Sequence, residues 1–120
     1  MKSKFEGDYR RVLCVCGAGL LRSATIAWVL SNEPYNYNTR AAGLRADALI
    51  PVTQPLLEWA DEIVCADKEH YDAISRMTDK KVHCLHITDD YDFRSDRLIC
   101  AVRTALRFTE LGKRAYSDNM

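Results

Sequence analysis

Residues that could attack and hold a phosphate group stand close together near the start of the chain, in residues 16–23 (CGAGLLRS). Gly17 and Gly19 let the backbone curl, so that successive amide N–H groups point inward and form a concave anion site. The guanidinium of Arg22 has a planar fork of donors that matches two phosphate oxygens. Its positive charge favours the thiolate form of Cys16, and a thiolate beneath a phosphate is a nucleophile. The segment therefore predicts nucleophilic chemistry on phosphate, with the Ser23 hydroxyl placed to donate to the thiolate.

The position of residues 16–23 in the chain is stronger evidence for an anion site than the spacing of Cys16 and Arg22. Arg11–Cys16 (RVLCVC) is apolar and β-rich and predicts a strand, and residues 20–30 have the apolar spacing of a helix. The anion site then lies between a strand end and a helix amino end, where backbone amides already favour an anion. In a plainer interpretation Cys16 is a buried strand cysteine and Arg22 a surface residue, which leaves the two glycines unexplained.

Apolar runs alternate with helical patterns along the rest of the chain. Each strand prediction rests on a β-rich run, and each helix prediction rests on apolar residues three or four positions apart, with Thr53 and Asp67 as helix N-caps. We expect further strands at residues 35–42, 61–65 and 81–87, helices at residues 53–59 and 67–77 and from residue 95 onward, and a frayed tail after Gly112.

Strands separated by helices predict an α/β fold, in which a parallel sheet carries helices on both faces through right-handed crossovers. In such sheets ligands bind beyond the carboxyl ends of the strands. The loop after Cys16 and an acidic loop at residues 88–92 (TDDYD) both follow strand ends, so we expect both at one rim of the sheet. The functional site is predicted where these two loops meet.

The composition is that of an ordinary globular domain. The chain has 120 residues and a mass of 13.7 kDa, with 48% hydrophobic and 28% charged residues. These values predict a single domain over residues 1–120, with its ordered core at about residues 10–112. Lysine plus arginine and aspartate plus glutamate each number 17, and this neutral balance argues against nucleic acid as the main partner.

Several patterns point to the cytoplasm. No apolar run approaches the roughly 20 residues that span a bilayer, which argues against a membrane partner. Residues 1–11 (MKSKFEGDYRR) are polar and do not indicate a signal peptide. The 5 cysteines are an odd count and are expected to be free thiols in a reducing compartment. Because His70, His83 and His86 show no zinc spacing with the cysteines, neither a metal nor an organic cofactor is predicted.

The loop and the segments that follow it resemble the low-molecular-weight protein tyrosine phosphatases, in particular a compact bacterial and phage-type branch. The similarity runs over about residues 11–107 and keeps several segments in order: RSATIAWVL, TRAAG, LLEWADEIVCADKEH and HCLHITDDYDF. It implies the phosphotyrosine phosphatase I-like fold, a three-layer sandwich with a four-stranded parallel sheet. It also implies Cys16 as the nucleophile, Arg22 as the phosphate clamp and Ser23 as the partner of the thiolate. The implied phosphate cradle consists of the loop amides of Gly17, Ala18, Gly19, Leu20, Leu21 and Arg22.

The general acid of that family is an aspartate after the fourth strand, usually followed by proline and an aromatic residue. Here the sequence is Asp89-Asp90-Tyr91, so the resemblance implies Asp89 as the acid and leaves Asp90, which replaces the proline, as the alternative. Without the resemblance, these acidic residues fit a solvated loop or a helix cap. Tyr91 is the candidate to stack on the substrate, since residues 44–50 lack the aromatic residue that often walls a phosphotyrosine ring.

Two further departures from the family pattern fall in the loop itself. Gly19 stands where the family often has asparagine, and either residue suits a left-handed turn. Leu21 replaces the second loop cysteine of many members, so that protective disulfide is absent. This leaves Cys14 either as a replacement partner for Cys16 or as a core residue.

The resemblance implies a cysteine-dependent phosphomonoester hydrolase, a protein tyrosine phosphatase, that acts through phosphocysteine on a phosphorylated protein or a small phosphoester. A thiol-dependent arsenate reductase shares the loop but needs relay cysteines, and Cys65, Cys84 and Cys100 form no evident pair. A phosphocysteine carrier similar to the IIB components of sugar phosphotransferase systems shares the Cys-Gly-x-Gly loop but uses no arginine clamp with an aspartate acid. A non-catalytic phosphate-binding module would bind equally well with serine in place of Cys16. The sequence does not set the oligomeric state.

Overall fold

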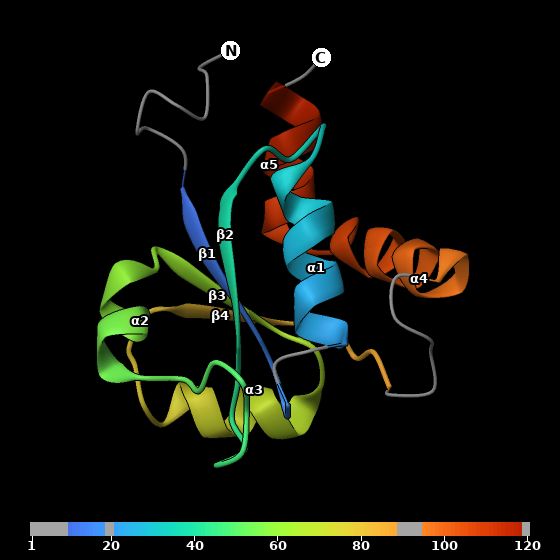
Figure 1. The fold of residues 1–120 in the computed structure, drawn as a ribbon. Helices are drawn as coiled ribbons and strands as arrows, with labels where there is room; N and C mark the ends of the chain where they lie inside the picture. The colour runs from blue at the N-terminus through green and yellow to red at the C-terminus, as the bar shows by residue number, and fades with distance from the viewer. Residues whose placement is uncertain (1–9, 19–20, 89–94, 119–120) are drawn as a thin grey trace.

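The computed structural model describes residues 10–18, 21–88 and 95–118, with the side chains of the last helix described through Arg114. Within these residues the chain forms a sheet of four parallel strands in the order β2-β1-β3-β4, with helices on both faces (Figure 1). The predicted α/β fold with a four-stranded parallel sheet is confirmed. In chain order the elements are β1 (Arg11–Cys16), α1 (Arg22–Ser31), β2 (Asn38–Gly43), α2 (Gln54–Trp59), β3 (Glu62–Cys65), α3 (Lys68–Ser75), β4 (Lys81–Cys84), α4 (Asp96–Leu106) and α5 (Glu110–Asp118). None of the helices in the described part of the chain is long and apolar enough to cross a membrane.

The alternation of side chains along β1 explains why helices cover both faces of the sheet. The last five residues of this strand are buried, and successive residues point to opposite faces. Val12, Cys14 and Cys16 belong to the core beneath α1, α4 and α5, whereas Leu13 and Val15 belong to the core beneath α2 and α3 (Figure 1). The fold is therefore a three-layer sandwich, and the side chain of Cys16 lies on its α1 side.

Two helix starts follow from their capping residues, as the sequence predicts. The Thr53 hydroxyl accepts a hydrogen bond from the Leu56 N–H at 3.4 Å, at the start of α2. The Asp67 carboxylate accepts one from the Lys68 N–H at 2.8 Å, at the start of α3. Such caps satisfy amides that have no partner inside the helix, and both N-cap predictions are confirmed.

The fourth strand ends earlier than its apolar run suggests. The sequence favours a strand over residues 81–87, but β4 ends at Cys84, and His86 adopts a left-handed conformation with a φ of 56°. The Leu85 N–H still donates to the carbonyl oxygen of Cys65, the last residue of β3, at 3.0 Å, and the Ile87 N–H donates to that of Ala66, the next residue, at 2.7 Å. The segment after β4 therefore runs beside the chain that leaves β3, although it is no longer a strand.

The second strand begins later than predicted, at Asn38. Tyr35 and Tyr37 precede it and are buried in the core beneath α1. The Tyr37 hydroxyl donates to the carbonyl oxygen of Leu111 at 2.9 Å. These tyrosines therefore pack a turn against α5, and their alternation resembles that of a strand without forming one.

The expectation of a frayed tail after Gly112 is wrong, because helix α5 continues well beyond this residue. Leu111 is fully buried. Gly112 approaches α4 so closely that an added Cβ would lie 2.1 Å from the carbonyl oxygen of Leu106. Arg114 forms an ion pair with Glu62 of β3. Contacts with distant parts of the chain therefore hold the last helix on the sheet.

A buried carboxylate at the amino end of β3 connects several elements. Glu62 is 1% exposed and accepts hydrogen bonds from Arg10 Nε at 2.7 Å, His83 Nε2 at 2.9 Å and Arg114 Nη2 at 2.5 Å. Burial by itself raises the pKa of Glu62, but the three donors outweigh burial and lower this pKa to about 2. Glu62 therefore stabilises the junction of β3 with β4, α5 and the residue that precedes β1.

Replacing this carboxylate destabilises the fold in a pH-dependent way. The pKa of Glu62 is about 2 in the folded protein and 4.5 when unperturbed, so its charged form contributes about 3 kcal/mol at pH 7. This contribution is complete above about pH 5, falls to about half near pH 3 and is lost as the pH drops through 2. We expect Glu62→Gln to lower the free energy of unfolding by about 3 kcal/mol at pH 7 and by about half as much at pH 3, measured by urea denaturation.

Glu58→Gln is the matched control for this measurement. Both substitutions remove one carboxylate, but the Glu58 side chain is exposed on α2. We expect Glu58→Gln to change the free energy of unfolding by less than about 0.5 kcal/mol. Equal stability of the wild type and Glu62→Gln at pH 7 would contradict the stabilising role of Glu62.

Candidate active site

Cys16 is the last residue of β1, at the carboxyl end of the sheet, and it is 3% exposed. Its sulfur lies 3.2 Å from the hydroxyl oxygen of Ser23, in the first turn of α1. In the thiol form the S–H donates to this oxygen, and in the thiolate form the Ser23 hydroxyl donates to the sulfur. The structure thus brings the two residues within hydrogen-bond distance, as their predicted partnership requires.

The connection between β2 and α2 holds the start of the loop that follows Cys16. The Leu44 N–H donates to the Cys16 carbonyl at 3.0 Å, and the Arg45 N–H donates to the Gly17 carbonyl at 2.9 Å. The aliphatic part of Arg45 lies 3.5 Å from the place that a Cβ on Gly17 would take. These contacts fix the path of the chain as it leaves the strand.

Helix α1 begins directly after this loop. Its N-cap is Leu21, whose side chain carries no oxygen to bond the first amides of the helix. A bound anion can use these N–H groups, because the amino end of a helix carries a partial positive charge. The hydroxyl and N–H of Thr25 both donate to the Leu21 carbonyl, at 2.9 and 3.2 Å, and fix the first turn. The structure therefore has the predicted setting of an anion site, a strand end followed by a helix amino end.

Arg22 is the first residue of α1 and is buried, at 8% exposed. Its Nη1 donates to the carbonyl oxygen of Ile87 at 2.9 Å. This bond links the start of α1 to the chain segment that follows β4. A guanidinium has five N–H donors, so it can hold a second acceptor while it stays anchored to Ile87. The plainer interpretation of Arg22 as a surface helix residue is wrong.

His70 is a residue of this region that sequence reasoning did not assign to the site. It is 3% exposed, and its Nδ1 accepts the Asp67 N–H at 3.1 Å, so the proton of the neutral ring lies on Nε2. This Nε2 lies 3.9 Å from the place that a Cβ on Gly17 would take. Burial, followed by the charge of Arg22, lowers the pKa of His70. The only sequence signal was the capping box formed by Asp67 and His70 at the start of α3.

The remaining cysteines do not protect Cys16 through a disulfide, since none of the five forms one. Cys14 lies two residues before Cys16 on the same face of β1, and such side chains project in parallel about 6.6 Å apart. The Cβ atoms of a disulfide lie only about 3.5–4.5 Å apart. Burial raises the pKa of Cys14, and burial together with Cys84 raises the pKa of Cys65 to about 12. Cys14 is therefore a protonated core residue.

Part of the predicted site falls outside the described residues, namely Gly19, Leu20, Asp89, Asp90 and Tyr91. The described members of the predicted site lie together between the end of β1 and the first turn of α1: Cys16, Gly17, Ala18, Leu21, Arg22 and Ser23. The assignment of Asp89 or Asp90 as the acid, and of Tyr91 as the stacking residue, stays a prediction.

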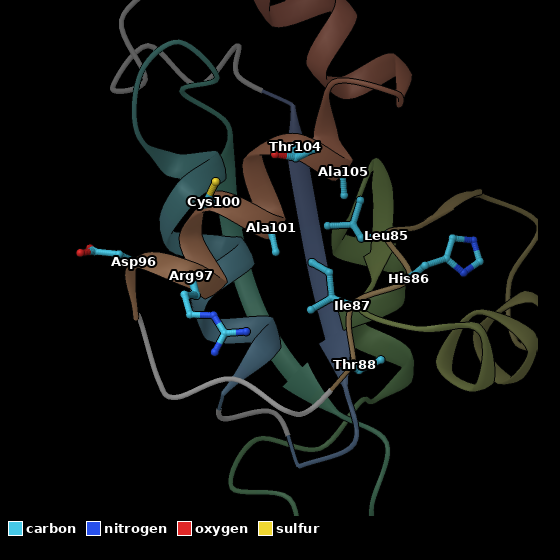
Figure 2. Close-up of a pocket in the computed structure, with 10 residues that line it drawn as sticks. All are labelled: Leu85, His86, Ile87, Thr88, Asp96, Arg97, Cys100, Ala101, Thr104 and Ala105. Carbon is cyan, nitrogen blue, oxygen red and sulfur yellow. The ribbon is translucent and has the colours of Figure 1, made fainter.

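A groove with a volume of about 750 Å³ lies between the segment after β4 and helix α4 (Figure 2). Leu85 and Ile87 form its sheet side, and alanines of α4 face them (Figure 2). Cys16 does not line this groove, but Ile87, which does, also accepts the hydrogen bond from Arg22. The groove therefore lies next to the place where the Arg22 side chain is anchored.

The fold is the one that the resemblance implied, the three-layer sandwich of the low-molecular-weight protein tyrosine phosphatases, with the Cys-x5-Arg loop after its first strand. No family model matches the chain, and neither does any curated protein. Solved structures, in contrast, match it over most of its length.

Three of these solved structures establish the likeness of the fold. The YwlE arginine phosphatase from Geobacillus stearothermophilus matches with a TM-score of 0.68 at 16% identity, over 92% of this chain and 93% of that one. Vibrio vulnificus Wzb in complex with benzylphosphonate matches with a TM-score of 0.64 at 17% identity, over 93% and 99% of the two chains. A YwlE mutant from Bacillus subtilis matches with a TM-score of 0.63 at 18% identity, over 93% and 100%.

The loop after β1 is expected to bind inorganic phosphate through Arg22. A charged hydrogen bond contributes about 1.5–3 kcal/mol, so Arg22→Met should weaken phosphate binding by roughly tenfold to a hundredfold. We expect phosphate to raise the melting temperature of the wild type and of Arg103→Met, an exposed arginine of α4, but not that of Arg22→Met at the same concentration. An equal phosphate-dependent shift in a folded Arg22→Met protein would contradict the assignment of the anion site.

Proposed function

We propose that this protein is a cysteine-dependent phosphomonoester hydrolase that acts through a phosphocysteine intermediate on a phosphorylated protein. The proposal is supported above all by the position of the Cys16 sulfur. This sulfur lies at the end of β1, 3.2 Å from the hydroxyl oxygen of Ser23. Ser23 directly follows the buried Arg22 at the start of α1. A thiol, its hydroxyl partner and an anchored guanidinium are the groups that nucleophilic attack on a phosphate ester requires.

In the first step the Cys16 thiolate attacks the phosphorus atom in line with the leaving oxygen. The S–P bond forms and the P–O bond breaks, while the carboxylic acid of Asp89 gives its proton to the leaving oxygen. Arg22 and the amides of the loop and of the first turn of α1 stabilise the negative charge on the three equatorial oxygens. The leaving alcohol or phenol departs and phosphocysteine remains.

In the second step a water molecule attacks the phosphorus atom of phosphocysteine. The carboxylate of Asp89 now accepts the proton of this water, the S–P bond breaks and the thiolate is regenerated. Orthophosphate is the product. The Ser23 hydroxyl stabilises the thiolate both before the first step and as it leaves in the second. Asp90 is the alternative for both roles of Asp89.

Two phosphorylated side chains are candidates for the substrate, and for phosphoarginine the bond that breaks is P–N, with the proton of Asp89 going to the leaving nitrogen instead of an oxygen. Wzb is in complex with benzylphosphonate, a phosphonate joined to an aromatic group, whereas YwlE of Geobacillus stearothermophilus is an arginine phosphatase. Tyr91, as the predicted stacking residue, favours phosphotyrosine. Peptides with phosphotyrosine or phosphoarginine in the same sequence distinguish the two candidates by their kcat/KM values.

The other cysteines give little support to an arsenate reductase. A reductase of that kind needs a second thiol that reaches the sulfur of Cys16. Cys14 and Cys65 are fully buried, and the pKa of each is raised by burial. Cys84 lies at the end of β4, where Asp67 and His86 are its neighbours. Cys14 and Cys65 therefore stay protonated and do not supply the thiolate that such a relay needs.

Loss of the nucleophile is expected to abolish turnover. We expect the wild type to release many equivalents of p-nitrophenol from p-nitrophenyl phosphate in the presence of EDTA, and Cys16→Ser to release none above background. Cys100→Ser, which removes an exposed thiol of α4, should keep the wild-type rate. Release of a single equivalent by the wild type would indicate a phosphocysteine carrier instead, and a fully active Cys16→Ser protein would overturn the proposal.

Loss of the acid is expected to slow the reaction more strongly for a poorer leaving group. General acid catalysis contributes about 10²–10⁴-fold, and phenolate needs a proton more than p-nitrophenolate does. We expect Asp89→Asn to lower kcat more for phenyl phosphate than for p-nitrophenyl phosphate, with Asp90→Asn as the matched control. The reverse pattern, with the loss confined to Asp90→Asn, would assign the acid to Asp90.

A further inference from the structure

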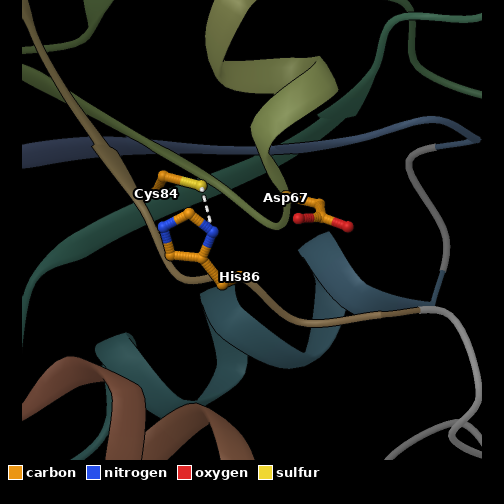
Figure 3. Close-up of side chains that lie close together, drawn as sticks. All are labelled: Asp67, Cys84 and His86. Carbon is orange, nitrogen blue, oxygen red and sulfur yellow. Dashed lines mark hydrogen bonds between the residues drawn. The ribbon is translucent and has the colours of Figure 1, made fainter.

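We propose that Asp67, Cys84 and His86 form a zinc site, separate from the site around Cys16 (Figure 3). Each residue offers one ligand atom, a carboxylate oxygen, the sulfur and a ring nitrogen, and these atoms all lie within 4.8 Å of one another. The ligands come from two chain segments, the start of α3 and the end of β4.

The sulfur of Cys84 and Nδ1 of His86 have nearly the spacing of two ligands on one metal ion. Zinc binds sulfur at about 2.3 Å and nitrogen at about 2.0–2.1 Å, so a tetrahedral angle places the two atoms about 3.6 Å apart. In the structure they are 3.7 Å apart (Figure 3). A movement of about 1 Å brings the Asp67 oxygen to the same spacing.

Helix α3 holds Asp67 in position. Oδ1 of Asp67 accepts a hydrogen bond from the Lys68 N–H at 2.8 Å, and the Asp67 N–H donates to Nδ1 of His70 at 3.1 Å. A carboxylate has two oxygens, so one can bind a metal while the other caps the helix. Hydrogen bonds of this kind orient the ligands of metal sites.

The backbone after β4 positions the other two ligands. Cys84 lies opposite Cys65 in the parallel pairing of β4 with β3. Leu85 lies in the core beneath α1, so Cys84, which precedes it, projects to the opposite face of the sheet, toward α3. The His86 ring lies beside the Cys84 sulfur (Figure 3). His86 is held between two backbone hydrogen bonds, from the Leu85 N–H to the Cys65 carbonyl at 3.0 Å and from the Ile87 N–H to the Ala66 carbonyl at 2.7 Å. The left-handed φ of 56° at His86 is uncommon for a residue other than glycine, and such conformations occur at binding sites.

The surroundings of the cluster are compatible with a cation. His86 is exposed, and Asp67 and Cys84 are half-buried, so a metal ion has access from solvent. The ammonium of Lys68 pairs with Asp72 at 3.0 Å, which offsets its charge. When zinc binds, the Zn–S bond forms as the thiol proton of Cys84 is released to solvent. The site then supplies two anionic ligands and one neutral imidazole.

The types of ligand favour Zn²⁺ over the hard cations. Thiolate and imidazole are preferred ligands of zinc, whereas Mg²⁺ and Ca²⁺ bind oxygen. Three protein ligands leave the fourth tetrahedral position to water. The sequence prediction of no metal rested on spacing along the chain. Spacing did not reveal this cluster because Asp67, at the start of α3, is distant in the sequence from Cys84 and His86.

The test is metal binding by the full chain with Cys16→Ser as the parent, so that the thiol of the loop does not contribute. Zinc affinity is measured by competition with a chromophoric chelator, and Co²⁺ is used as a spectroscopic probe. We expect one equivalent of Zn²⁺ to bind and Co²⁺ to show a thiolate-to-metal charge-transfer band. Adding Cys84→Ser should remove this band and lower zinc affinity by at least about tenfold. Adding Cys100→Ser, an exposed cysteine of α4, should change neither.

Two further variants remove a ligand while they spare the backbone. Asp67→Asn keeps an oxygen that caps α3, and His86→Asn keeps a residue that tolerates the left-handed conformation. Each should lower zinc affinity by at least about tenfold. Unchanged affinity in Cys84→Ser, or Co²⁺ binding without a thiolate band, would overturn the proposal. Because the parent lacks the nucleophile, these outcomes do not depend on whether the protein is a phosphatase.

Discussion

The hydrogen bond from Arg22 Nη1 to the carbonyl oxygen of Ile87, at 2.9 Å, joins the two parts of the chain that make up the candidate site. Arg22 follows the first strand and Ile87 follows the fourth, so the bond forms only once the sheet is assembled. The acceptor is itself held in place, because the Ile87 N–H donates to the Ala66 carbonyl at 2.7 Å. A buried guanidinium without a partner would cost several kcal/mol. The fold therefore fixes Arg22 and brings the segment after β4 to the loop after β1.

The two ends of the sheet use buried charge differently. At the amino end, three donors surround the carboxylate of Glu62, and this arrangement serves stability. At the carboxyl end, the buried Arg22 is anchored through one N–H to the Ile87 carbonyl, and a guanidinium carries five such donors. The segment after β4 also contacts two different parts of the molecule, since the Ile87 carbonyl accepts the hydrogen bond from Arg22 while Cys84 and His86 lie near Asp67 at the start of α3. One short stretch of chain thus contributes to both proposed sites.

Much of the fold and the centre of the site follow from local sequence patterns. The six residues RVLCVC form β1 as predicted, because an apolar β-rich run before a glycine loop has few other conformations. Thr53 and Asp67 begin helices because their side chains accept the amides that a helix leaves without partners. Cys16 and Arg22 lie on either side of the loop for the same local reason, and the α/β class follows from the alternation of strands and helices.

Only the tertiary structure decided features that depend on contacts between distant segments. Arg22 is held by the carbonyl of the distant Ile87, and helix α5 is held by the bond from Tyr37 to Leu111 together with the ion pair of Arg114 with Glu62. Apolar spacing contains no information about such pairs, so local patterns gave a strand at Tyr37 and a frayed tail after Gly112. The position of His70 beside Gly17 depends equally on how α3 packs. The sequence by itself therefore determined the first strand, the helix caps and the loop that separates Cys16 from Arg22, because these rest on neighbouring residues. The tertiary structure decided which distant side chains meet, because those contacts exist only after the sheet has formed.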